Sequence, residues 1–101
     1  MKYDKLVRDN IPEIIKKDGK TARVHVANDM EYDRKLKEKL LEEANEYAAC
    51  GDPEELADVL EVVYAIAINK GIHKVQLESM VQNKRNEKGS FEKRIVLDEI
   101  R

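Results

Sequence analysis

The chain has 101 residues, enough for one compact domain and too few for two self-sufficient ones. Charged residues make up 40% of it, against roughly 25% in an average chain, while aromatic residues are 5% and tryptophan is absent. This composition argues against a large sandwich or barrel core and favours helices with solvated charged faces. The net charge of −2 excludes strong non-specific binding to nucleic acid by bulk charge, but leaves a local basic patch open.

Cysteine content and hydropathy both indicate a soluble, cytoplasmic protein. Cys50 is the only cysteine, so no intramolecular disulfide is available. The sequence contains no apolar run of about 18 residues that could span a membrane. Its first residues, Met1 to Lys5, lack the apolar core of a signal peptide. We therefore expect a single domain over residues 1–101 in the cytoplasm.

The first half of the chain predicts two helices. Pro12 to Lys17 is expected to form a short helix, because proline suits a first helical turn. Residues 21–27 alternate in character and contain β-branched valines, a pattern that allows a short strand. A long helix is predicted over Glu31 to Ala49, which contains no Gly, Pro or β-branched residue and follows Asn28 as a capping residue.

Two more helices are predicted in the second half. Gly51 ends the long helix, and Asp52 is a good capping residue for the next one. That second helix is expected from Pro53 to Lys70, and Gly71 ends it. A third is expected from Ile72 or His73 to about Lys88, followed by an extended tail or strand over residues 91–100.

An acidic pair with a spacing of three residues occurs at the same place on both central helices. At about 100° per residue, Glu43 lies inside the apolar arc of the long helix and Glu46 lies at its edge. Glu55 and Asp58 have the same relation to the apolar arc of the second helix. If the two helices fold into an antiparallel hairpin about Gly51, the four carboxylates converge in one patch.

Such a patch requires positive charge, because clustered carboxylates without a partner are costly to bury. Oxygen donors without His or Cys suit a hard divalent cation, Mg²⁺ first and Mn²⁺ as an alternative. Because Mg²⁺ commonly bridges to substrate phosphates, the implied ligand is a phosphorylated compound. The competing interpretation is ordinary solvated helix charge, with Glu55 completing the cap at Asp52 and Lys39 pairing with Glu43.

Three segments of the chain resemble one protein family. EEANE at 42–46, followed by ELAD at 55–58, resembles the E-E-x-x-E … E-x-x-D signature of the MazG-like all-α nucleoside triphosphate pyrophosphohydrolases. The opening YDKLVRDNIPEII at 3–15 and KGSFEKRIVL at 88–97 resemble a branch of small phosphoribosyl-ATP pyrophosphohydrolase-like proteins. The chain departs from that pattern in the short spacing between Glu46 and Glu55, and in Lys88 and Ser90, where the branch usually has Arg and Gly.

The resemblance implies a mainly α fold, an antiparallel MazG-like helical bundle with short extended N- and C-terminal segments, that forms a homodimer or homotetramer. It also implies Mg²⁺-dependent hydrolysis between the α and β phosphates of a nucleoside triphosphate or a phosphoribosyl-ATP-like substrate, giving a monophosphate and pyrophosphate. Residue by residue, the implied metal ligands are Glu43, Glu46, Glu55 and Asp58.

Within this hypothesis Glu46 is our choice of general base, and Glu43 is the second catalytic carboxylate. Phosphate charge that the metal does not meet needs Lys or Arg. The candidate phosphate-binding residues are the pair Lys84 and Lys88, one helical turn apart, together with Arg94, Lys5 and Arg8.

Two other functions stay open from the sequence. One is a non-catalytic helical dimerisation or regulatory module, which would tolerate loss of the carboxylates. The other is nucleic-acid binding through a basic stretch that acidic neighbours dilute. That stretch comprises Lys84, Arg85, Lys88, Lys93 and Arg94. The extensive apolar surface of the second helix further predicts a second copy of the chain as its cover.

Overall fold

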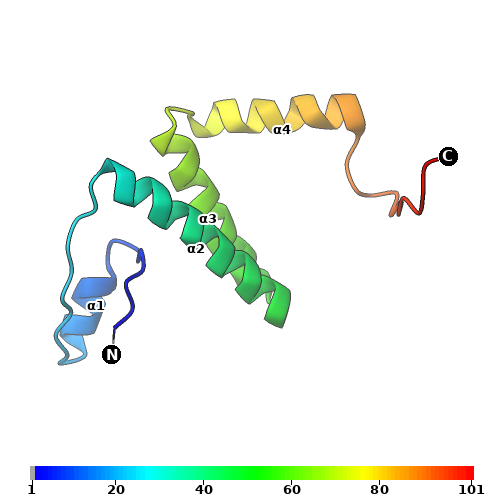
Figure 1. Cartoon of the computed structure of the whole chain (residues 1–101). Coiled ribbons are helices and arrows are strands. Elements are labelled where there is room, and N and C mark those ends of the chain that lie inside the picture. Colours follow the sequence, from blue (N-terminus) through cyan, green and yellow to red (C-terminus); the bar gives the residue numbers. More distant parts are fainter. Residues whose placement is uncertain (1) are drawn as a thin grey trace.

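The computed structural model describes residues 2–101, and within that range it contains four α-helices and no strand (Figure 1). The prediction of an all-helical protein is thereby confirmed. The helices are α1 (Ile11–Lys17), α2 (Asp29–Cys50), α3 (Pro53–Asn69) and α4 (Lys74–Lys88). Each boundary lies within two residues of its predicted position, because local capping and chain-breaking residues determine the helix ends.

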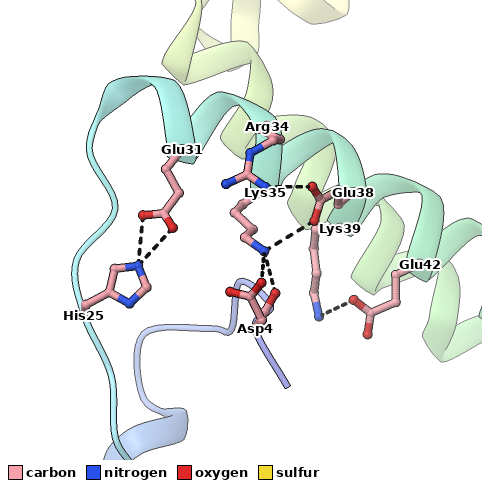
Figure 2. Close-up of polar contacts among 8 residues, drawn as sticks. All are labelled: Asp4, His25, Glu31, Arg34, Lys35, Glu38, Lys39 and Glu42. Atoms are coloured by element: carbon pink, nitrogen blue, oxygen red, sulfur yellow. Dashed lines mark hydrogen bonds and ion pairs between the residues drawn. The ribbon is translucent and has the colours of Figure 1, made fainter. Parts of the chain in front are cut away.

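The strand allowed for residues 21–27 is not formed. This segment runs as an exposed connection between α1 and α2, and nothing among residues 2–101 pairs with it as a second strand. A single strand leaves its backbone donors and acceptors without ladder partners, so β propensity alone does not order it. His25 instead contacts Glu31 on the first turn of α2, with its Nε2 2.9 Å from Oε1 (Figure 2).

An antiparallel hairpin of α2 and α3 forms the centre of the molecule. The Asn28 side chain accepts a hydrogen bond from the Glu31 amide and begins α2. Gly51 ends α2 in the left-handed conformation, with φ 70°, and this turn reverses the chain within two residues. Asp52 then accepts a hydrogen bond from the Glu54 amide and begins α3.

The buried core is small and lies between α2 and α3. Leu36 is 2% exposed, and Val62 and Ala67 are the other buried apolar residues among residues 2–101. The radius of gyration is 17.7 Å, whereas a compact domain of this length has about 13 Å. The chain is therefore elongated, 59 Å by 32 Å by 24 Å, and it leaves much apolar surface uncovered.

Beyond the hairpin, α4 extends away from α2 and α3 (Figure 1). Gly71, with φ 78°, makes the corner, and Lys74 Nζ lies 4.6 Å from the centroid of the Tyr64 ring on α3. No residue of α4 is buried, and Phe91 in the following tail is 98% exposed. Among residues 2–101, no helix is long and apolar enough to cross a membrane.

Replacing Leu36 tests where the core lies. Leu36→Ala is expected to lower the free energy of unfolding by about 2–4 kcal/mol, because it leaves a cavity between the two helices. Leu41→Ala, on the same helix but at a side chain that is 65% exposed, should change it by less than about 0.5 kcal/mol. Urea denaturation at one fixed protein concentration measures both, and equal losses would contradict the assignment of the core.

Candidate metal centre

Three of the four predicted carboxylate ligands meet between α2 and α3. Glu43, Glu55 and Asp58 each offer an oxygen, and these oxygens lie within 4.8 Å of one another. The antiparallel hairpin brings them together, because all three lie near the Gly51 turn on the two helices that pack against each other. We call these three residues the acidic triad.

Burial distinguishes the acidic triad from ordinary surface charge. Glu43 is 7% exposed, and its Oε1 lies 3.2 Å from Lys39 Nζ. Its Oε2 is buried and has no hydrogen-bond partner within residues 2–101, and the same holds for Glu55 Oε2. Buried carboxylate oxygens without partners are rare, since each has lost water without gaining a donor. Glu43 is therefore not a solvated charge, although the contact with Lys39 that the competing interpretation predicted is formed.

Glu46 is the predicted ligand that lies outside the triad. Glu46 is exposed, and it is the residue that the helical period placed at the edge of the apolar arc of this helix. It is nevertheless close enough to act on Glu55. Desolvation, followed by the negative charges of Glu46 and Asp58, raises the pKa of the Glu55 carboxyl above its ordinary value. Glu46 and Asp58 thus disfavour ionisation of Glu55.

The N-terminal arm, residues 4–8, lies across this acidic face. Arg8 Nη2 donates to Asp58 Oδ1 at 2.7 Å, and Lys5 Nζ donates to Glu42 Oε1 at 3.1 Å. The arm therefore places two positive charges on carboxylates of α2 and α3. In this structure both predicted phosphate-binding residues of the arm bind carboxylates instead.

Lys35 anchors the start of the arm, and the sequence interpretation missed it. It is one of the two buried charged residues among residues 2–101, and its Nζ donates to the Asp4 backbone carbonyl and lies 3.3 Å from Asp4 Oδ2 (Figure 2). Glu38 on the same helix lies 3.4 Å away and completes the contact. The helical period did not predict its burial, because Lys35 lies about 100° from Leu36 around the helix and outside the apolar arc. Its partner at residue 4 cannot be read from local sequence either.

Glu42 contacts the arm and is not part of the triad. Lys5 lies 3.1 Å from its Oε1 and Lys39 3.3 Å from its Oε2. Partial desolvation opposes ionisation of Glu42, but these two cations outweigh it and lower the pKa of its carboxyl. Reciprocally, the hydrogen bond to Glu42 raises the pKa of Lys5. Glu42 therefore binds the arm through Lys5.

The other candidate phosphate-binding residues lie apart from the triad. Lys84 and Lys88 are on the final turns of α4, which points away from the hairpin, and Arg94 lies in the tail beyond it (Figure 1). Helix α4 packs against α3 near the corner and makes no packing contact with α2. Within one chain these basic residues do not join the acidic triad.

The triad fits a hard divalent cation. An octahedral Mg²⁺ with ligands at about 2.1 Å has opposite oxygens about 4.2 Å apart, and the three oxygens here lie within 4.8 Å. The donors are all carboxylate oxygens, and two of the carboxylates carry a buried oxygen without a partner. Neighbouring oxygens on such an ion are about 3.0 Å apart. The three side chains would therefore draw closer around the ion and leave open positions for water or phosphate.

Comparison with protein-family models, with curated proteins and with solved structures finds no match to this chain.

The raised pKa of Glu55 gives a pH-dependent prediction. Between its ordinary and its raised pKa the folded state holds more protons than the unfolded state, so stability falls as pH rises through this window. Glu55→Gln should therefore stabilise the metal-free protein at about pH 7 but not at about pH 3.5, where Glu55 is already neutral. Thermal denaturation at both pH values measures the difference.

Glu54→Gln is the matched control for this experiment. Glu54 is exposed in the same first turn of α3, so its substitution removes the same favourable interaction with the helix dipole. It should not stabilise the protein at either pH. Equal effects of the two substitutions would show that Glu55 experiences no special repulsion.

Proposed function

We propose that this protein is a Mg²⁺-dependent nucleotide pyrophosphohydrolase of the MazG-like all-α superfamily. It cleaves between the α and β phosphates of a nucleoside triphosphate or a phosphoribosyl-ATP-like substrate, releasing a monophosphate and pyrophosphate. The observation that carries the proposal is the convergence of carboxylate oxygens of Glu43, Glu55 and Asp58 within 4.8 Å, with a buried, unpartnered Oε2 on Glu43.

Chemistry and motif order support the same assignment. The three converging residues are members of the E-E-x-x-E … E-x-x-D pattern, and the ends of the chain carry the two flanking motifs. A purely structural module gains nothing from buried carboxylates that repel one another, because apolar residues of similar size would pack there at lower cost. The cost is understandable if the carboxylates bind a cation.

Each residue of the acidic face has a distinct role in this proposal. Glu43, Glu55 and Asp58 hold the ion, and Lys39 orients Glu43 through its Oε1. When bound, the ion neutralises phosphate charge, polarises phosphorus and lowers the pKa of a bound water. Glu46 is exposed beside Glu55, where it is accessible to solvent as the general base.

We also propose that the protein acts as a homodimer or homotetramer. The outer face of α3 exposes Leu56, Leu60 and Ile68, and the tail exposes Phe91 and further aliphatic side chains. A single elongated chain buries too little apolar surface to be stable alone, so a second copy is the expected cover. A second copy is also the route by which Lys84, Lys88 and Arg94 could reach an acidic triad.

Activity should depend on both the ion and the triad. EDTA is expected to abolish pyrophosphate release, and Asp58→Asn should lower it at least about 100-fold, because a ligand of the ion loses its charge. Glu61→Gln, an exposed position on the same helix, should leave it unchanged. A pyrophosphate-release screen across nucleotides, with and without Mg²⁺, makes the measurement.

Circular dichroism shows whether Asp58→Asn stays folded. A folded wild-type protein that releases no pyrophosphate from any nucleotide would favour the non-catalytic module. Pyrophosphate release that persists in EDTA would contradict the role of the ion.

Oligomerisation is tested by sedimentation. The wild-type mass should be a multiple of 11.7 kDa, and Leu60→Asp should shift it toward the single chain, because it places a charge on the apolar face of α3. Leu41→Asp, an exposed leucine on α2, is the matched control and should leave the mass unchanged. A wild-type protein with the mass of one chain would contradict the proposal.

A further inference from the structure

The acidic face and the basic residues that touch it are unequal in charge. Five carboxylates belong to this face, namely Glu42, Glu43, Glu46, Glu55 and Asp58. Three basic side chains reach it from within residues 2–101, namely Lys5, Arg8 and Lys39. Two negative charges remain uncompensated when all of these groups are ionised. One divalent cation would neutralise them while every existing contact stays in place.

The contact between Arg8 and Asp58 opposes binding of a divalent cation while the arm stays in place. Arg8 Nη2 lies 2.7 Å from Asp58 Oδ1, so its guanidinium is paired with one of the three carboxylates of the triad. A divalent cation held by the same carboxylate would lie next to that positive charge, and like charges at this range repel. Arg8 and the cation are therefore competitors for Asp58.

The three basic residues differ in how firmly they are held. Lys39 is part of α2, and its side chain is 15% exposed. Arg8 and Lys5 belong to the arm, outside any helix. The Arg8 side chain is 56% exposed and the Lys5 side chain is 43% exposed. Exposed ion pairs of this kind are weak, so the arm is the part that yields.

We infer that the N-terminal arm is a tethered counter-ion that a divalent cation displaces from the acidic triad. This inference rests on the proposed function, because it takes the cation to be the ligand of the triad. Lys5 and Arg8 together carry the same charge as one divalent ion, so the exchange leaves the charge of the face unchanged. In the metal-free protein the arm stabilises carboxylates that would otherwise repel one another.

The triad is more than an acidic cluster, which is why it can carry this inference. Glu43 is more than nine-tenths buried, and its Oε2 has no hydrogen-bond partner within residues 2–101. Neither Lys5 nor Arg8 donates to that oxygen, so docking of the arm leaves it unsatisfied. A cation in the triad satisfies it, and this difference favours the exchange.

The first test is the affinity for Mn²⁺, measured by calorimetry on the full chain. Arg8→Gln should tighten Mn²⁺ binding about two- to fivefold, the range expected for removal of a competing exposed ion pair. Arg8→Lys keeps the charge and should stay near the wild-type value. Arg23→Gln removes an exposed arginine of the α1–α2 connection and should have no effect.

The second test follows the arm itself by limited trypsin digestion with mass detection. Mn²⁺ should accelerate cleavage after Lys5 and Arg8 severalfold, because the arm leaves the helices. Cleavage after Arg23, in the already exposed connection, is the internal control and should not change. In Arg8→Gln, cleavage after Lys5 should be fast without Mn²⁺. This readout separates exchange from a general electrostatic effect, which would alter affinity without releasing the arm.

The outcomes separate this inference from the proposed function. Mn²⁺ binding with an unchanged rate of arm cleavage, or with equal or weaker affinity in Arg8→Gln, overturns the exchange and leaves the metal centre standing. Absence of Mn²⁺ binding in both wild type and Arg8→Gln overturns both. If Arg8→Gln does not fold, Lys5→Gln is expected to show the same accelerated Arg8 cleavage and a smaller gain in Mn²⁺ affinity, and the absence of both effects overturns the exchange.

Discussion

Mutual repulsion of carboxylates across the α2–α3 seam is the constraint on which the rest of this structure depends. Glu43 on one helix and Glu55 and Asp58 on the other are held within 4.8 Å by the same packing that forms the small core. The helices cannot separate the carboxylates without exposing Leu36 and Val62, and ionisation of Glu55 beside other carboxylates opposes that packing. The seam thus contains an unfavourable interaction that added positive charge, or protonation of Glu55, relieves.

The basic residues around the seam differ in exposure and in the part of the chain that carries them. Lys39 supplies charge from within α2 and is fixed in place, whereas Lys5 and Arg8 supply it from a segment without helical structure. Buried Lys35 secures the beginning of that segment through Asp4, so the arm has a fixed end and a removable end. Lys39 alone therefore does not neutralise the carboxylates of the seam. The arm supplies further positive charge at Asp58, a residue that a cation would also need.

Local signals predicted the helices well, and long-range contacts limited the rest. The ends of α2 and α3 could be predicted from sequence, because they depend on local hydrogen bonds of Asn28, Gly51 and Asp52. Each of these residues bonds to a partner no more than four residues away. Helical period and one tight turn also sufficed to bring together three of the four carboxylates, while Glu46, at the edge of its face, stayed outside. The arm contacts join residues 37 and 50 positions apart and carry no periodic signal. The strand allowed at 21–27 failed for a related reason, since strand formation requires a partner that this chain does not supply.

The open shape of the chain is consistent with a centre formed near the tip of a hairpin. The core lies along the helices, whereas the acidic triad lies toward the Gly51 turn, so a cation and a phosphate chain could approach without disturbing Leu36. Rigid helices hold the ligand atoms, which favours a defined coordination geometry over the adaptable one of a loop. The apolar faces of α3, α4 and the tail are left for another surface to cover. A second copy of the chain that covered those faces would stabilise the hairpin from outside, and so would offset the repulsion that the carboxylates impose from within.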